Sequence, residues 1–290
     1  MDTLAIVLRF GSYAVLSLIA GVPLFLWLAL GRDRGRLVFR QIRAAYALLL
    51  ILGAALALFG LLAATAAMTG TALFPVEWDM VALVLSATAS GKAIVARATL
   101  LIVLLPLAMR ASLRPAALIA ALATATLAWS GHAAAGEGMA GGLHLLADML
   151  HILAAALWIG GMACLLLSLH RAQGGATLPM LHAFALIGSV TVGLLIATGI
   201  LNGVMIIGLD ALPAALGTIY GRLLAIKVGA FLVMLLLAAN NRFRLTPAFE
   251  RHAITARPAL RRAIGVEIAL AFLILLLVGW LGMIDPMAAA

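Results

Sequence analysis

The chain has 290 residues, of which 66% are hydrophobic and only 10% are charged, a composition far from that of a soluble domain. Its formal net charge is +9, but the basic residues stand in short segments between apolar runs, where they report membrane topology and not nucleic-acid binding. The single cysteine, Cys164, excludes an internal disulfide and a cysteine-based metal cluster. We therefore expect a membrane protein without a nucleic-acid partner.

Apolar runs of about 20 residues recur along the chain, and each is long enough to cross about 30 Å of hydrocarbon as a helix. They predict an all-α, polytopic bundle that forms one integral membrane domain over residues 1–290. Residues between Pro75 and Ser90 are expected to add a short interfacial helix, because Trp78 suits the membrane–water boundary. The eight predicted transmembrane helices cover about residues 4–30, 44–68, 91–109, 115–132, 143–169, 181–207, 219–239 and 264–283.

Most of the 19 Lys and Arg residues lie in the segments that follow the first, third, fifth and seventh predicted spans. The richest of these segments are residues 32–43 and 242–262. Basic loops face the cytoplasm in membrane proteins. Both termini, and the loop before the fifth span, are therefore expected on the outer, periplasmic side.

The fifth predicted span carries polar residues that an ordinary membrane helix does not need. His144, Asp148 and His151 stand at offsets of four and seven, so they project from one side of the helix. Burying a carboxylate and two imidazoles in an apolar helix is costly, which marks a site or a pathway. Imidazole suits copper and other transition metals, and the thioether of Met139 favours Cu(I). His132, at the end of the fourth span, can join His144 across a short glycine-rich loop.

Several interpretations of this polar face remain open. His144 and His151 are about 10 Å apart along the helix, so one small ion cannot easily contact both. Asp148 between them forms either successive ligand stations or a carboxylate that orients an imidazole. In a purely structural interpretation, Asp148 bonds the histidines and Arg97 or Lys227 from neighbouring helices and only holds the bundle together. The spacing itself does not identify a metal.

The residues of this region carry a family resemblance. The segments GHAAA at Gly131–Ala135 and LHLLADMLHILAAALWIGG at Leu143–Gly161 resemble the signature region of the copper resistance protein D family. The segments YGRLLAIK at Tyr220–Lys227 and NRFRLTP at Asn241–Pro247 are similar to the next recognisable part of that family. With the eight-span layout, the resemblance covers nearly the whole chain.

The resemblance implies a multi-pass protein of the bacterial inner membrane that handles copper, usually by importing periplasmic copper into the cytoplasm. It implies a copper ion, Cu(I) or Cu(II), as the transported or bound metal, and we expect no enzymatic activity. Besides the lipid bilayer, the implied partner is a separate periplasmic copper-binding protein of the copper resistance C type. The copper-site candidates carried over from the resemblance are His132, His144, Asp148, His151 and Met139.

Two other functions fit parts of the pattern. A haem-binding membrane electron carrier would ligate iron through histidines of neighbouring helices, with His132 and His144 as one pair and His170 and His182 as another. His144 and His170 are about 39 Å apart along one helix, which is too far for two stacked haems. A sensor or scaffold that binds copper and recruits a partner would show metal binding without flux.

Overall fold

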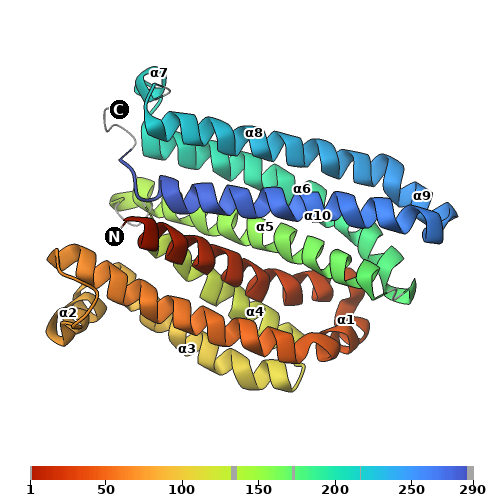
Figure 1. Ribbon diagram of the computed structural model, residues 1–290, viewed down its shortest axis with the longest axis horizontal. Coiled ribbons are helices and arrows are strands. Elements are labelled where there is room, and N and C mark those ends of the chain that lie inside the picture. The colour runs from red at the N-terminus through yellow and green to blue at the C-terminus, as the bar shows by residue number, and fades with distance from the viewer. Residues whose placement is uncertain (1, 132–135, 172–173, 216, 286–290) are drawn as a thin grey trace.

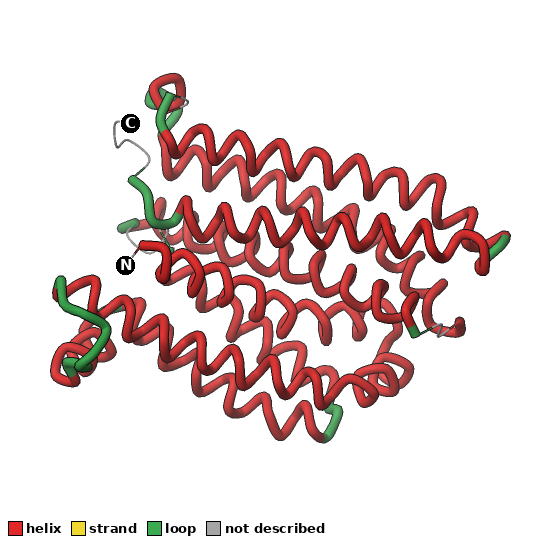
Figure 2. Tube along the Cα trace, in the orientation of Figure 1, coloured by secondary structure: helices red, strands yellow, loops and turns green. Residues whose placement is uncertain are grey.

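The structure is a computed structural model that describes residues 2–131, 136–171, 174–215 and 217–285. These residues form a bundle of helices without a strand (Figures 1 and 2). Seven helices are long and apolar enough to cross a membrane, which confirms the all-α membrane class. The main helices of the bundle are α1 (Asp2–Thr69), α3 (Ala89–Met109), α4 (Leu113–Ala125), α5 (Gly138–His170), α6 (Gly174–Ile207), α8 (Ile219–Asn240) and α10 (Ala253–Leu281).

Helix α1 contains the first two predicted spans. Its backbone leaves the helical region at Gly31, where φ is 70° and ψ is −169°, a conformation that glycine adopts without steric cost. Figure 1 shows the two arms on either side of this residue, residues 2–30 and residues 32–69, running back along each other. The hydroxyl of Tyr46 on the second arm donates to the carbonyl of Ile19 on the first at 2.7 Å. Because one helix holds both spans, seven helices are counted and the eight-span layout stays a prediction.

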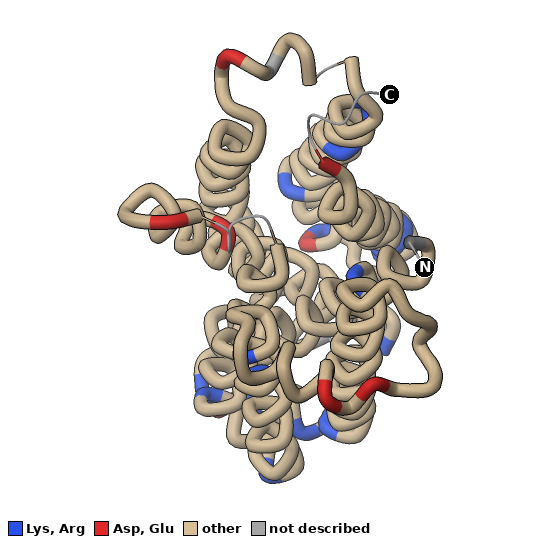
Figure 3. The backbone as a smooth tube through the Cα atoms, turned by 90° about the vertical axis from the view of Figure 1, so that its left-hand side faces the viewer, with Lys and Arg blue, Asp and Glu red and all other residues tan. Residues whose placement is uncertain are grey.

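The two ends of the bundle differ in charge. The turn at Gly31 lies at the same end as α9 (Thr246–Arg251), whereas the N-terminus and α2 (Trp78–Ala87) lie at the other end (Figure 1). We call the first the basic end, because the arginines of residues 32–43 and 242–262 lie there. Figure 3 faces the opposite end and shows Asp and Glu on its connecting segments. The side of the membrane that each end faces stays a prediction.

Two short elements bear on the predicted layout. Helix α2 forms where a short interfacial helix was expected, and Trp78 is exposed in it. The predicted loop between the last two spans is largely helical instead: a π-helix, η3 (Asn241–Leu245), and α9 lead into α10, which begins well before residue 264. At the end of the fourth span, α4 continues into a 3₁₀-helix, η1 (Thr126–Ser130).

Helix α5 lies at the centre of the bundle and packs directly against the first arm of α1. A Cβ atom added to Gly21 would lie 1.8 Å from the carbonyl oxygen of Ala156, and one added to Gly160 would lie 2.1 Å from the carbonyl carbon of Gly21. Small residues thus allow backbone-to-backbone contact, as is common between membrane helices. The most apolar window of α5 is 67% buried, the largest share among the seven helices. On this helix His144 is buried, and Asp148 and His151 are partly buried.

Candidate functional site

The polar face of α5 meets α6 through two pairs of side chains. The amide Nδ2 of Asn202 donates to Oδ1 of Asp148 at 3.2 Å, and Nδ1 of His151 lies 2.9 Å from Oγ1 of Thr198. The partners are three residues apart on α5 and four apart on α6, so the pairs stack one turn above the other. The spacing of polar residues predicted the α5 residues of this face but not their partners on α6. The missed signal is that Thr198 and Asn202 also share one face of an apolar helix.

The contacts of Thr198 define the state of the His151 ring. The Thr198 hydroxyl donates to the carbonyl of Leu194 at 2.5 Å. A hydroxyl has one proton, so its oxygen accepts the hydrogen bond from Nδ1–H of His151. Nε2 of His151 then keeps its lone pair and can bind a metal ion. Gly199 leaves room beside the ring, since a Cβ there would lie 3.4 Å from Cε1 of His151.

Two cations surround Asp148. Lys227 from α8 and Arg9 from the first arm of α1 both act on this carboxylate electrostatically. Arg97, named with Lys227 as a structural partner, instead donates from Nε to Oγ1 of Thr126 at 2.8 Å. The charge of Lys227 thus acts on Asp148, whereas the hydrogen bond of Arg97 goes to Thr126.

Asn202 adds a further oxygen atom to the polar face around Asp148. Oδ1 of Asn202 is buried and has no hydrogen-bond partner in the described part of the chain. With the Asp148 carboxylate and Nε2 of His151, this polar face contains one nitrogen and several oxygen atoms that are each able to bind a cation. No group of three His, Cys, Asp or Glu side chains that could hold a metal ion occurs among the described residues. Such an arrangement suits weak, successive binding, which an ion needs in order to leave as well as enter.

The other predicted ligands lie at different depths. His144 is buried on α5, with 6% of its surface exposed. Met139 lies in the first turn of α5 and is 85% exposed, about 13 Å along the helix from Asp148. His132 lies outside the described residues, but Gly131 before it approaches α5, since a Cβ there would lie 3.8 Å from Oδ2 of Asp148. The structure thus brings together Asp148 and His151 and leaves Met139 at the surface.

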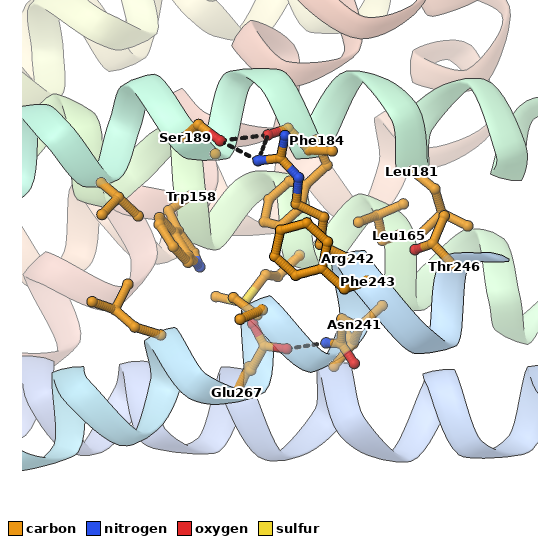
Figure 4. A pocket seen from close by; sticks show the side chains of 18 of the residues that line it. Trp158, Leu165, Leu181, Phe184, Ser189, Asn241, Arg242, Phe243, Thr246 and Glu267 are labelled. Carbon is orange, nitrogen blue, oxygen red and sulfur yellow. Dashed lines mark hydrogen bonds between the residues drawn. The ribbon is translucent and has the colours of Figure 1, made fainter. Parts of the chain in front are cut away.

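A second polar site lies nearer the basic end, in a cavity of about 330 Å³ between α5, α6, α8, η3 and α10. Glu267 of α10 is 1% exposed and accepts a hydrogen bond from Nδ2 of Asn241 (Figure 4). Trp158 of α5 lines the same cavity, seven residues beyond His151. Nε1 of Trp158 and Oδ1 of Asn241 are buried without a partner among the described residues. We call this space the carboxylate cavity.

Glu267 and Asn241 were not among the site residues predicted from the sequence. The available signal was a lone carboxylate inside the last predicted span, which is costly to bury in a membrane. Asn241 begins the π-helix η3, a type of distortion that is frequent at functional sites. The next residue, Arg242, donates to Ser189 and to the carbonyl of Ala185, and so ties η3 to α6 (Figure 4).

The histidines of the second haem pair lie at the basic end. His170 and His182 are both exposed, and His182 pairs with Glu250 through Nε2. The nitrogen that would bind iron is therefore engaged by a carboxylate in this arrangement.

Comparison with known families supports the resemblance. Residues 1–142 match the family described as "Copper resistance protein D-like, N-terminal domain", and residues 178–281 match the family described as "Copper resistance protein D". The polar face of α5 lies between the two matched ranges. No solved structure matches the chain significantly.

Three curated relatives extend this finding. The chain is 28% identical over 163 residues to "Inner membrane protein YebZ" of Escherichia coli strain K12, with 55% of each chain covered. It is 34% identical over 145 residues to "Copper transport protein CutJ" of Bacillus subtilis strain 168, covering 49% of this chain and 26% of the relative. It is 32% identical over 308 residues to "Copper resistance protein D" of Pseudomonas syringae pv. tomato, with 98% of this chain and 97% of the relative covered. Since that match spans both chains almost completely, this multi-pass membrane protein belongs to the copper resistance protein D family.

Proposed function

We propose that this protein imports copper ions across the bacterial inner membrane along the polar face of α5. The observation that carries the proposal is the pair of contacts Asp148–Asn202 and His151–Thr198, which place metal-binding donors inside an apolar bundle. Family membership supports copper as the ion. The names of two relatives, a copper transport protein and an inner membrane protein, support transport and the location.

The proposed route starts at the end opposite the basic end and follows α5 inward. Copper passes from His144 to the Asp148 carboxylate and Nε2 of His151. Trp158 lies about 10 Å further along α5 and borders the carboxylate cavity, where Glu267 offers the next anionic group. Imidazole nitrogen suits copper in either oxidation state, and the carboxylate and amide oxygens offset its charge. A separate periplasmic copper-binding protein of the copper resistance C type would deliver copper to the entrance.

In this route, Lys227 controls how strongly Asp148 binds copper. Its ammonium group balances Asp148 when copper is absent and competes with the ion when copper arrives. This competition keeps binding at Asp148 weak enough for onward transfer. A membrane potential of 100 mV, negative inside, acts on one unit charge with about 2.3 kcal/mol and favours inward movement.

The test is copper uptake into liposomes that contain the purified chain. We expect the double substitution His144→Ala, His151→Ala to lower uptake at least about tenfold, because it removes both imidazoles of the route. His252→Ala, at an exposed position at the basic end, is the matched control and should transport normally.

Three results would contradict the proposal. Copper binding by the native chain without flux would favour a sensor or scaffold. A haem Soret band in the purified protein would favour an electron carrier. Unchanged uptake by the folded double variant would exclude the α5 route while leaving copper transport itself standing.

A further inference from the structure

A second cavity of about 330 Å³ lies away from the α6 side of α5, between the two arms of α1, α3 and η1. Most of its wall is apolar and made of small residues on the second arm. Its polar lining residues, by contrast, include two arginines and no carboxylate within the described part of the chain. These polar residues are Arg9, Ser12, Tyr13, Ser90, Arg97 and Ser130. We call this space the arginine cavity.

Arg97 is the most deeply placed of these residues, with 4% of its surface exposed. Its Nε is held by Thr126 at 2.8 Å, and the Thr126 hydroxyl is in turn held by the carbonyl of Ala123 at 2.6 Å. This chain of contacts fixes the guanidinium plane. Nη2 of Arg97 is buried and has no hydrogen-bond partner in the described residues. The structure thus orients a charged donor at the cavity and leaves that donor unused.

Arg9 adds a second charge to the same space. Its Nε is also buried without a partner among the described residues. The carboxylate that acts on Arg9 is Asp148, which Lys227 shares. Two cations, Arg9 and Lys227, therefore share one carboxylate, and Arg97 adds a third positive charge near Tyr13 in the same half of the bundle. Uncompensated charge inside a membrane protein is expensive, so an anion is the missing component.

The shape of the cavity specifies how the anion enters. Ser90 stands near the start of α3 and Arg97 lies about 10 Å further along that helix, so the cavity leads inward from the end opposite the basic end. Ala57, Gly60 and Ala64 on the second arm leave space opposite the arginines. An apolar wall with cations at its base suits an amphiphile as well as a small ion.

We propose that the arginine cavity binds a phosphate-type oxyanion, with Arg97 and Arg9 as its ligands. The planar guanidinium fork matches phosphate oxygens through paired, charge-assisted hydrogen bonds. The same chemistry is offered by the headgroup of an acidic phospholipid and by free phosphate. This binding does not depend on copper transport, because it uses residues outside the α5 route.

The experiment measures lipid and phosphate binding by the full chain in detergent, with native mass spectrometry and thermal unfolding as readouts. The probes are phosphatidylglycerol, phosphatidylcholine of the same acyl length, and inorganic phosphate. We expect Arg97→Gln to weaken binding of the anionic probe at least about tenfold. Arg97→Lys keeps the charge but loses the planar guanidinium group. It should bind the anionic probe more weakly than the native chain and more tightly than Arg97→Gln. Lys92→Gln, an exposed cation on the same helix, is the matched control and should bind as the native chain does.

The outcomes separate the two sources. Selective binding of phosphatidylglycerol without a response to phosphate assigns the site to a lipid headgroup, whereas stabilisation by inorganic phosphate alone assigns it to a free ion. Absence of both responses in the native chain overturns the proposal, as does equal loss in the Lys92→Gln control. Should Arg97→Gln fail to give monodisperse protein, Arg9→Gln provides the same comparison, and native-like binding by that variant also overturns it.

Discussion

The arginine cavity and the carboxylate cavity have similar volumes, about 330 Å³ each, but differ in their charged residues: two arginines line the first, whereas Glu267 and Arg242 line the second. The first presents Arg97 and Arg9, with buried donors that lack partners. The second presents Glu267 and Asn241, with a buried amide oxygen that lacks one. The rest of each wall is mostly apolar, with small residues in the first cavity and larger aromatic and aliphatic residues in the second. Under the two proposals above, one or two buried side chains, and not the apolar helices around them, decide which ion each cavity accepts.

Helix α5 stands beside both spaces and carries the polar face between them. In the proposed import route, a cation at Asp148 or His151 would be repelled by the arginines and attracted by an ionised Glu267 carboxylate. Such forces act strongly inside a membrane bundle because the effective dielectric constant is low. Under that proposal, both groups favour movement of the cation towards the basic end.

The largest effect, on stability, is expected where the backbone contact between α1 and α5 is disrupted. Gly160→Leu would push the side chain into the backbone of Gly21, where the added Cβ already lies 2.1 Å from the carbonyl carbon. We expect a loss of stability of more than about 3 kcal/mol and little monodisperse protein, since helix backbones and not flexible side chains must move. Thermal unfolding in detergent measures this. Gly229→Leu on α8, with open space around it, is the control; equal loss in both variants would contradict this account.

A smaller effect is expected from neutralising the carboxylate cavity. Glu267→Gln keeps the size of the side chain and removes its charge, so the chain should fold and still bind copper at Asp148. Uptake into liposomes should fall at least about tenfold, because the inward attraction for the cation is lost. Glu250→Gln, an exposed carboxylate at the basic end, should transport normally. Native uptake by Glu267→Gln would remove this cavity from the route.

The smallest effect is expected at the contact that orients His151. Thr198→Val removes the acceptor for Nδ1–H and frees the ring to turn. Copper binding should weaken about fivefold, because one neutral hydrogen bond contributes about 1 kcal/mol. A copper-binding isotherm of the purified protein measures this. Thr191→Val is the control, because the Thr191 hydroxyl donates only to Ile187 of its own helix; weakening by that variant alone would argue against the orienting role.

Local pattern predicted much of the fold. Helix α5 covers Gly138–His170 and contains the predicted span, and α8 ends within a residue of its predicted boundary. Hydropathy acts along the chain, so it can be read without knowing the neighbours. Helix α10 begins at Ala253, before the last predicted span at about residue 264, and its first turns carry Arg257, Arg261 and Arg262. Arginine is a good helix former, and charge therefore marks the end of the apolar run and not the end of the helix.

The candidate site, like the fold, could be predicted from the sequence only in part. The spacing of Asp148 and His151 determined that both side chains leave α5 on one side. It did not determine that Asn202 and Thr198 would face them, or that Glu267 would meet Asn241. Those pairs join residues from different helices, and their register depends on how the helices slide and rotate against each other.

The sequence by itself therefore determined the membrane class, the helical segments, the charge of the two ends and the polar face of α5, because each depends on residues close along the chain. The tertiary structure alone decided which polar groups meet and which stay without a partner. Backbone contact at Gly21 and Gly160 sets the position of α5 against α1, and the remaining helices pack around that pair. Two cavities with different charged residues result from this packing, which no local pattern encodes.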